Sequence, residues 1–295
     1  MYNLTFGADP EVFATINLNG EYEVISPALL NKFSGMEFIT KDYKHPTFIE
    51  EKDFIWMMDG VATELTLNKP YQDPFLMKND LLNSLDSLQE FLSKLSFEGN
   101  DLHLYKKPVV KINPERYLPY LEDELIYQGF IFGCDPDKDA ILPDYRCQTF
   151  KVKDHKLRYG GGHIHLGSND LEIRKAIKEN VHRLVHLMAI GVGNLCISTS
   201  VFPEEDKLRV FHYGKPGRFR DDKEYGIEYR TPSNSWLSNL DILPQIFETC
   251  NKCIYYLLRE KEGLEKTIQL LPKTIESITT ANQDLAENLY KEFME

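Results

Sequence analysis

The sequence lacks the features that mark membrane, secreted and disulfide-stapled proteins. No window approaches the ~18 uninterrupted apolar residues of a membrane-spanning helix. The first residues contain no basic region followed by an apolar run, so we see no secretory signal. The five cysteines are odd in number and scattered, which is not typical of a disulfide framework. We therefore expect a protein of the cytoplasm with no membrane partner.

Positive charge is also scarce. Lysine and arginine number 34 against 46 aspartates and glutamates, which gives a net charge of −12. Such a balance makes nucleic acid an unlikely main partner, although a local basic patch could still bind an anion. The 42% hydrophobic and 27% charged fractions are ordinary for a globular protein and exclude collagen-like and disordered classes. We find no internal repeat and no convincing linker in the 295 residues.

The hydrophobic pattern predicts strands first and helices later. Asn19-Gly20 and Asp59-Gly60 are turn dipeptides between alternating segments, so residues 10–25 and 53–68 are predicted hairpins. A long amphipathic helix is expected from Pro74 to about Leu95. Further elements are expected as strands near 130–133, 145–152, 157–167, 207–213 and 224–231, helices at 170–192 and 239–260, and a helical tail at 263–293 interrupted by Pro272. The predicted class is α+β, built on an antiparallel sheet.

Four predicted strands carry polar side chains two residues apart, which places each pair on one face of the sheet. These pairs are Asp9 and Glu11, Glu64 with Thr66 and Asn68, His163 and His165, and Glu228 and Arg230. One such pair is common on any solvated sheet face. Together they collect Glu, Asp and His, which are ligand types for divalent metals. Converging carboxylates would repel one another, so we predict bound Mg²⁺ or Mn²⁺.

The most basic stretch of the chain, residues 207–223, leads into the strand that carries Glu228 and Arg230. Within it, Tyr-Gly-Lys-Pro-Gly-Arg-Phe-Arg (213–220) combines glycines with arginines, whose forked guanidinium groups suit phosphate. A solvated surface loop would have a similar composition. Its position beside metal-binding carboxylates favours phosphoryl transfer from ATP, a chemistry of positioning and charge neutralisation.

The combined pattern resembles a known family. Gly-Ala-Asp-Pro-Glu (7–11), Asp-Gly-Val-Ala-Thr-Glu-Leu-Thr-Leu-Asn (59–68), Arg-Tyr-Gly-Gly-Gly-His-Ile-His-Leu-Gly (158–167), the 213–220 segment and Tyr-Gly-Ile-Glu-Tyr-Arg-Thr-Pro-Ser-Asn-Ser-Trp (225–236) are similar to the phage-encoded carboxylate-amine ligases, or amidoligases, of the glutamine synthetase-like superfamily. The resemblance covers about residues 6–237 in order and spacing.

The resemblance implies a curved antiparallel sheet with helices packed on one face, as in the glutamine synthetase catalytic domain. It implies a catalytic domain at 1–262 and a C-terminal helical extension at 263–295 packed on it. It also implies an ATP-dependent and Mg²⁺-dependent ligase that activates a carboxylate as an acyl phosphate for attack by an amine. The implied metal ligands are Glu11, Glu64, Glu228 and one of His163 and His165; the implied catalytic residues are Glu64, Arg230, Arg218 and Arg220; the implied cofactor-binding residues are Lys215, Arg209, Asn68 and Asp59.

Other functions stay open at this point. The same sheet could serve a guanidino-kinase-like phosphotransferase, or a non-catalytic phage structural or interaction protein that keeps the fold. A zinc hydrolase using His163 and His165 is the weakest alternative. For the ligase, we expect a small-molecule or protein carboxylate and an amine as partners, possible homo-oligomers, and the host cytoplasm as location if a phage encodes the chain.

Overall fold

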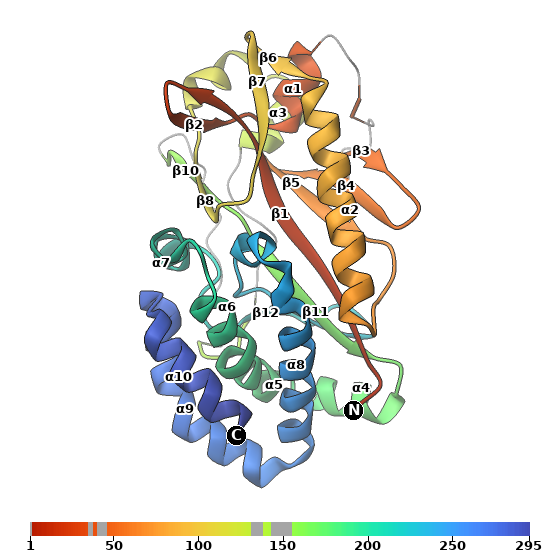
Figure 1. Ribbon diagram of the computed structural model, residues 1–295, viewed down its shortest axis with the longest axis vertical. Helices are drawn as coiled ribbons and strands as arrows, with labels where there is room; N and C mark the ends of the chain where they lie inside the picture. The colour runs from red at the N-terminus through yellow and green to blue at the C-terminus, as the bar shows by residue number, and fades with distance from the viewer. Residues whose placement is uncertain (1, 35–37, 40–45, 131–137, 143–154) are drawn as a thin grey trace.

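A computed structural model describes residues 2–34, 38–39, 46–130, 138–142 and 155–295. The chain is a mixed α and β protein with a large, mainly antiparallel sheet, as the sequence predicts at the level of class. Strand β1 (Leu4–Leu18) is its centre and crosses the molecule diagonally (Figure 1). It pairs with β11 and β2 and also with β5 and β7, so several segments of the chain meet on this one strand.

Thirteen strands lie among the described residues. Besides β1 and the two-residue β6 and β9, they are β2 (Glu21–Val24), β3 (Thr47–Glu50), β4 (Phe54–Asp59), β5 (Ala62–Leu67), β7 (Asn100–Tyr105), β8 (Val109–Lys111), β10 (Leu157–Tyr159), β11 (Gly162–Ser168), β12 (Arg218–Arg220) and β13 (Gly226–Tyr229). The helices are α1 (Pro27–Phe33), α2 (Pro74–Ser93), α3 (Glu124–Phe130), α4 (Leu171–Glu179), α5 (Val181–Met188), α6 (Asn194–Ser198), α7 (Pro203–His212), α8 (Leu243–Leu258), α9 (Glu260–Thr280) and α10 (Gln283–Met294).

Both hairpins predicted from turn dipeptides are confirmed: β1 turns into β2 at Asn19-Gly20, and β4 turns into β5 at Gly60. Helix α2 is confirmed as well. It begins at Pro74, and the Asp73 side chain caps it by accepting a hydrogen bond from the Phe75 amide at 2.8 Å. These elements follow from local sequence signals, which explains why the pattern predicts them.

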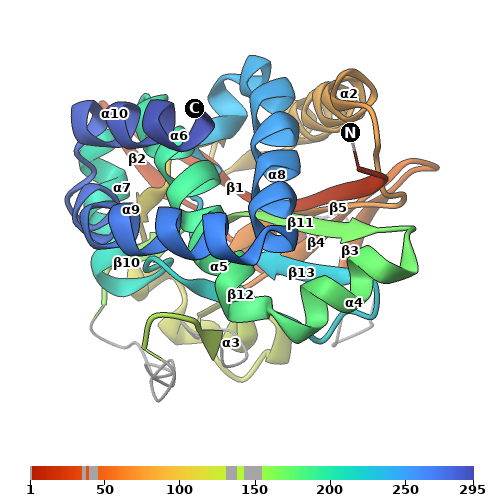
Figure 2. The same ribbon diagram turned by 90° about the horizontal axis from the view of Figure 1, so that it is seen from below.

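Helices α2, α4 and α5 pack on the apolar face of the sheet. On β11 and β13, Ile164, Leu166, Ile227 and Tyr229 are buried and alternate with His163, His165 and Glu228, so apolar and polar residues point to opposite faces. Helices α4 and α5 contact these strands, while α2 packs on β4 and β7. Seen from below, α5, α8, α9 and α10 lie together over one end of the sheet (Figure 2).

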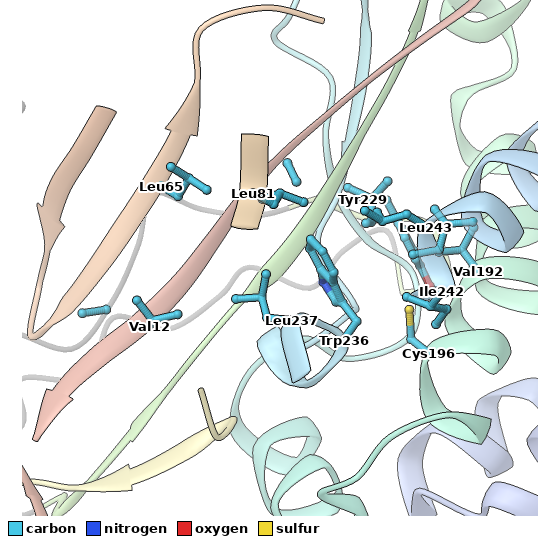
Figure 3. Packing of buried hydrophobic residues seen from close by; sticks show 14 of the residues in the cluster. Val12, Leu65, Leu81, Val192, Cys196, Tyr229, Trp236, Leu237, Ile242 and Leu243 are labelled. Carbon is cyan, nitrogen blue, oxygen red and sulfur yellow. The ribbon is translucent and has the colours of Figure 1, made fainter. Parts of the chain in front are cut away.

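The core joins the sheet to these helices. Tyr229 of β13 lies beside Leu243 and Val192 of the helical layer (Figure 3). Trp236 is almost fully buried in the short helix η4 (Asn234–Ser238), and its indole nitrogen donates a hydrogen bond to the Gly162 carbonyl at 3.0 Å. This bond ties the helical layer to the start of β11, the strand that carries both predicted histidine ligands.

The C-terminal helices α9 and α10 pack against α6, and α9 also contacts α7 and α8. The predicted domain boundary at residue 262 lies inside α9. The predicted interruption at Pro272 is wrong, because α9 continues through it. Pro272 and Ile268 lie on the exposed side of the helix, where water can reach the carbonyl that proline leaves without a donor.

Several other predicted elements are wrong. Residues 207–212 form part of helix α7 rather than a strand: Pro203 lies in the first helical turn, and Asp206, Arg209 and Val210 are buried at helical spacing. The predicted strand 157–167 is two strands, since β10 pairs with β8 and β11 with β1. The helix expected at 170–192 breaks at Asn180 and continues through a π-helical turn to Ser198.

The region expected to be loop-rich, 99–150, contains β7, β8 and α3 within its described part. Of the strands predicted near 130–133 and 145–152, Phe130 ends α3 and the remaining residues lie outside the described ranges. One helical stretch, Val181–Ser198, is long and apolar enough to cross a membrane, but 72% of it is buried within the protein. A core helix meets the same criteria, so this stretch is weak evidence for a membrane span.

Candidate metal and phosphate site

Strand register brings the predicted polar pairs together. Asp9 on β1 lies directly opposite His163 on β11, and His165 lies opposite Glu228 on β13. On the other edge of β1, Glu11 lies opposite Glu64 of β5. Directly opposed residues of antiparallel strands project to the same face of a sheet. The carboxylates and histidines from four strands therefore share one polar face, away from the apolar face covered by helices.

Three of these side chains form a first possible cation site, Asp9, His163 and Glu228, whose ligand atoms lie within 4.8 Å of one another. His163 Nδ1 is 3.1 Å from Asp9 Oδ1 and 3.4 Å from Glu228 Oε1. His165 is close by, with Nε2 3.1 Å from Asp9 Oδ2. Of the two predicted histidines, His163 is thus the one that joins a cluster of three possible ligands.

Three carboxylates form a second possible site, Glu11, Asp59 and Glu64, again with ligand atoms within 4.8 Å. Glu11 is buried, Glu64 is half-buried and Asp59 is exposed, so this site opens to solvent on the Asp59 side. Glu11 Oε2 accepts a hydrogen bond from the Gly161 amide at 2.8 Å. A Cβ atom at position 161 would lie 2.4 Å from His163 Nε2, so this position needs glycine for the chain to pass between the two sites.

In the second site, ionisation of the three carboxyl groups is unfavourable. Burial, followed by the charge of Asp59, raises the pKa of Glu11 to about 8. Burial and then the charges of Asp9, Asp59 and Glu11 raise the pKa of Glu64 well above its ordinary value. Burial likewise raises the pKa of Asp59, although its solvent exposure moderates the effect. A divalent cation would reverse these shifts by favouring the ionised carboxylates.

The first site is balanced differently. Burial alone would raise the pKa of Asp9, but the charges of His165 and His163 and their close contacts hold it below its ordinary value. Burial and then Arg230 lower the pKa of His163. Burial opposes the charged form of His165, yet Asp9 raises its pKa above the ordinary value. The negative charge of Asp9 is therefore offset by the two histidines, whereas in the second site the neighbouring carboxylates raise one another's pKa and the Gly161 amide and the arginines offset this only in part.

Arg230 connects the polar groups of the first site. Its Nη1 atom donates a hydrogen bond to Glu228 Oε1 and lies 3.3 Å from His163 Nδ1. Its Nη2 atom donates to the hydroxyl of Tyr213 at 2.8 Å. The predicted catalytic arginine is thus only 3% exposed and in contact with two possible cation ligands.

The other predicted arginines and Lys215 lie along the segment that precedes β13. Arg220 of β12 is opposite Glu228, and its positive charge lowers the pKa of Asp59. Arg218 is buried, with its Nε 3.4 Å from Asp139 Oδ2, and its carbonyl accepts a hydrogen bond from the Arg230 amide. The Lys215 carbonyl accepts a hydrogen bond from the Thr231 hydroxyl at 2.9 Å. These bonds hold the 213–220 segment beside the strand that carries Glu228 and Arg230.

Two predicted cofactor-binding residues have contacts of a different kind. Arg209 is 1% exposed and donates hydrogen bonds to the Thr231 and Pro232 carbonyls at 2.8 and 3.1 Å. It therefore joins α7 to the end of β13. Asn68 is exposed just after β5, and its amide donates to the carbonyls of Glu51 and Lys52 at 3.2 Å. Both side chains support local structure, and their contact with a cofactor stays a prediction.

Sequence reasoning overlooked two residues of this site. The predicted ligands do not include Asp9, although it forms a polar pair with Glu11 on β1 and lies within the Gly-Ala-Asp-Pro-Glu motif. Tyr213 begins the basic glycine-rich segment, and its hydroxyl contacts both His163 and Arg230. Both residues lie within motifs that the sequence shows, so they could have been proposed from it. Their contacts could not, because these depend on pairing between strands that are distant in the chain.

The donor set fits a divalent cation. Asp9 Oδ1 and His165 Nε2 are buried atoms with no hydrogen-bond partner among the described residues, even though each lies 3.1 Å from a neighbouring polar atom. Such atoms are costly to bury unless a further group satisfies them. Carboxylate oxygens are suited to Mg²⁺ and Mn²⁺, and five of the six possible ligands in the two clusters are carboxylates.

Comparison of the sequence with models of protein families found no match, and comparison with curated proteins found none either.

Proposed function

We propose that the chain is an ATP-dependent and Mg²⁺-dependent ligase that forms an amide bond between a carboxylate and an amine. In this proposal the sheet is of the glutamine synthetase type, with the cation sites on its polar face. The main support is the pair of adjacent three-ligand clusters, both built on β1, with Arg230 and Arg220 next to them. Acidic ligands beside arginines are what phosphoryl transfer requires.

The proposed roles follow from these positions. Asp9, His163 and Glu228 would hold one divalent cation, and Glu11, Asp59 and Glu64 a second. Mg²⁺, when bound, would neutralise the charge on the phosphates of ATP. Arg230 and Arg220 carry forked donors on the same face and would stabilise the negative charge that develops on the transferred phosphoryl group.

The proposed reaction has two steps. An oxygen of the substrate carboxylate attacks the γ-phosphorus of ATP, ADP leaves, and an acyl phosphate forms. The nitrogen of the amine then attacks the acyl carbon, phosphate leaves with the bonding electrons, and the amine loses a proton. The acid and the amine could each belong to a metabolite or to a protein.

Hydroxylamine provides a direct test, because it replaces the amine and converts an acyl phosphate to a hydroxamate. The protein would be incubated with ATP, Mg²⁺, hydroxylamine and a panel of carboxylic acids, and both ADP and hydroxamate would be measured. The expected result is equal amounts of ADP and hydroxamate with one class of acid. ADP formation with a phosphorylated product and no hydroxamate would indicate a phosphotransferase instead.

The variant that tests the second site is Glu64→Gln. This change keeps the size of the side chain but removes one ligand charge from the second site. It should abolish hydroxamate formation while the protein stays folded by circular dichroism. A rate equal to that of the unchanged protein would refute the assignment of this site, and no ADP with any acid would refute the ligase.

A further inference from the structure

Tyr213 lies where α7 ends and the basic segment begins. The residue is the C-cap of α7 in an extended conformation, and its amide donates a hydrogen bond to the Arg209 carbonyl at 2.7 Å. Its side chain is half-buried and turns toward the polar face of the sheet. The helix end therefore fixes the position of the Tyr213 backbone, and the side chain reaches from the end of α7 to residues of β11 and the end of β13.

Two arginines lie near the Tyr213 ring. The Arg209 guanidinium lies 4.8 Å from the ring centroid and that of Arg230 lies 5.9 Å from it. Cation–π contacts of this kind are favourable and restrict the ring. Gly214 follows at φ +72°, and a Cβ atom there would lie 2.1 Å from Arg209 Nη1. The Tyr-Gly pair thus lets the chain turn tightly around Arg209, whose own hydrogen bonds fix it to Thr231 and Pro232.

The Tyr213 hydroxyl meets the outer nitrogen of His163. It lies 3.1 Å from Nε2, while Nδ1 on the other side of the imidazole faces Asp9, Glu228 and, at 3.3 Å, Arg230 Nη1. A neutral imidazole carries one proton, so Nδ1 can bind a cation only when that proton is on Nε2. A proton on Nε2 needs an acceptor because His163 is 1% exposed.

We propose that Tyr213 is a positioning residue for the cation site of Asp9, His163 and Glu228: its oxygen accepts the Nε2–H hydrogen bond of His163 and leaves Nδ1 unprotonated, so that the Nδ1 lone pair, which faces Arg230 Nη1 in this structure, can bind a divalent cation instead. The inference rests on the proposed cation site of the ligase. The phenol oxygen has two lone pairs, so it accepts this bond together with the one from Arg230 Nη2. Tyr213 then fixes both the histidine tautomer and the direction of the Arg230 fork.

The test uses the full chain and two tyrosine variants. Tyr213→Phe keeps the ring near the two arginines but removes the acceptor. Tyr22→Phe is the matched control, since Tyr22 is 40% exposed and stacks on Tyr105, away from the polar groups of the site. Mn²⁺ binding would be followed by electron paramagnetic resonance, and thermal unfolding would confirm that each variant is folded.

Loss of an outer hydrogen-bond partner of a ligand typically weakens metal binding by about 10- to 100-fold, and we expect Tyr213→Phe to weaken one class of Mn²⁺ site by that factor. The second class, at Glu11, Asp59 and Glu64, should keep its affinity, and Tyr22→Phe should change neither. Equal Mn²⁺ affinity of Tyr213→Phe and the unchanged protein would overturn the inference and leave the ligase proposal intact. No Mn²⁺ binding by the unchanged protein would overturn both.

The tautomer provides a second readout that a structural role would not move. In the ¹⁵N-labelled protein saturated with Mg²⁺, His163 should show its proton on Nε2 by nuclear magnetic resonance, and Tyr213→Phe should reduce that population. A proton on Nδ1 in the Mg²⁺-saturated unchanged protein would overturn the inference.

Discussion

Replacing Glu11 by glutamine should stabilise the protein in the absence of metal, although Glu11 belongs to the candidate site. Glutamine has nearly the same shape, and its carbonyl oxygen can still accept the hydrogen bond from the Gly161 amide. The change removes a carboxyl group that is 5% exposed and lies beside Asp59 and Glu64. The effect of Glu11→Gln on the free energy of unfolding therefore comes mainly from the loss of the negative charge.

The size of the effect follows from the pKa of Glu11, which rises from 4.5 to about 8 in the folded protein. Between these values the native protein holds a proton that the unfolded chain releases, so stability falls as the pH rises. The difference of 8 − 4.5 = 3.5 corresponds to at most about 5 kcal/mol above pH 8, and to almost nothing near pH 4.5. Coupling to Glu64 and Asp59 shares this penalty among the three carboxyl groups.

The assay is urea unfolding in EDTA at pH 5 and pH 9, for the unchanged protein and for Glu11→Gln. The variant should be more stable at pH 9 and nearly equal at pH 5. Glu50→Gln, on the exposed end of β3, is the matched control and should have little effect at either pH. Stabilisation of the same size at both pH values, or destabilisation at pH 9, would refute the electrostatic explanation.

Two further predictions concern the surroundings of the site. Gly214→Ala combines a positive φ with a Cβ only 2.1 Å from Arg209, whereas Gly20→Ala combines a positive φ with open space. Thermal unfolding should show a loss of roughly 1–3 kcal/mol for the first beyond that of the second, and equal losses would contradict the proposed crowding. Asp9→Asn should lower the pKa of His165, because Asp9, more than Glu228, raises that pKa against the effect of burial. Titration followed by nuclear magnetic resonance measures this pKa, and an unchanged or higher value would show that Asp9 does not set it.

Sequence patterns were sufficient where the signal is local. Asn19-Gly20 forces positive φ angles, and Pro74 with the apolar stripe after it defines a helix without help from distant residues. They failed at 207–213, where a strand is predicted and the structure has the end of α7. The acidic first turn after Pro203 carried the helical signal, and buried Arg209 completes the helical face.

The candidate site was predictable in its residue types but not in its grouping. Alternation places Asp9 and Glu11 on one face of β1, yet it cannot tell that Asp9 meets His163 while Glu11 meets Glu64. That division depends on the register of strands more than 50 residues apart in the chain. The role of Tyr213 depends on its position at the end of helix α7. It could not be predicted because residues 207–213 are predicted as a strand.

The shared strand β1 also determines when each cluster can form during synthesis. Glu11, Asp59 and Glu64 are all present once the first 67 residues have folded as β1, β4 and β5. The cluster of Asp9 needs His163 and Glu228, which come much later in the chain. The Glu11 carbonyl accepts a hydrogen bond from Asn234, which is 223 residues further along. Contacts at such separation form slowly. All residues of the acidic cluster are therefore present in the first 67 residues of the chain, whereas the complete pair of sites needs residues as far as Glu228.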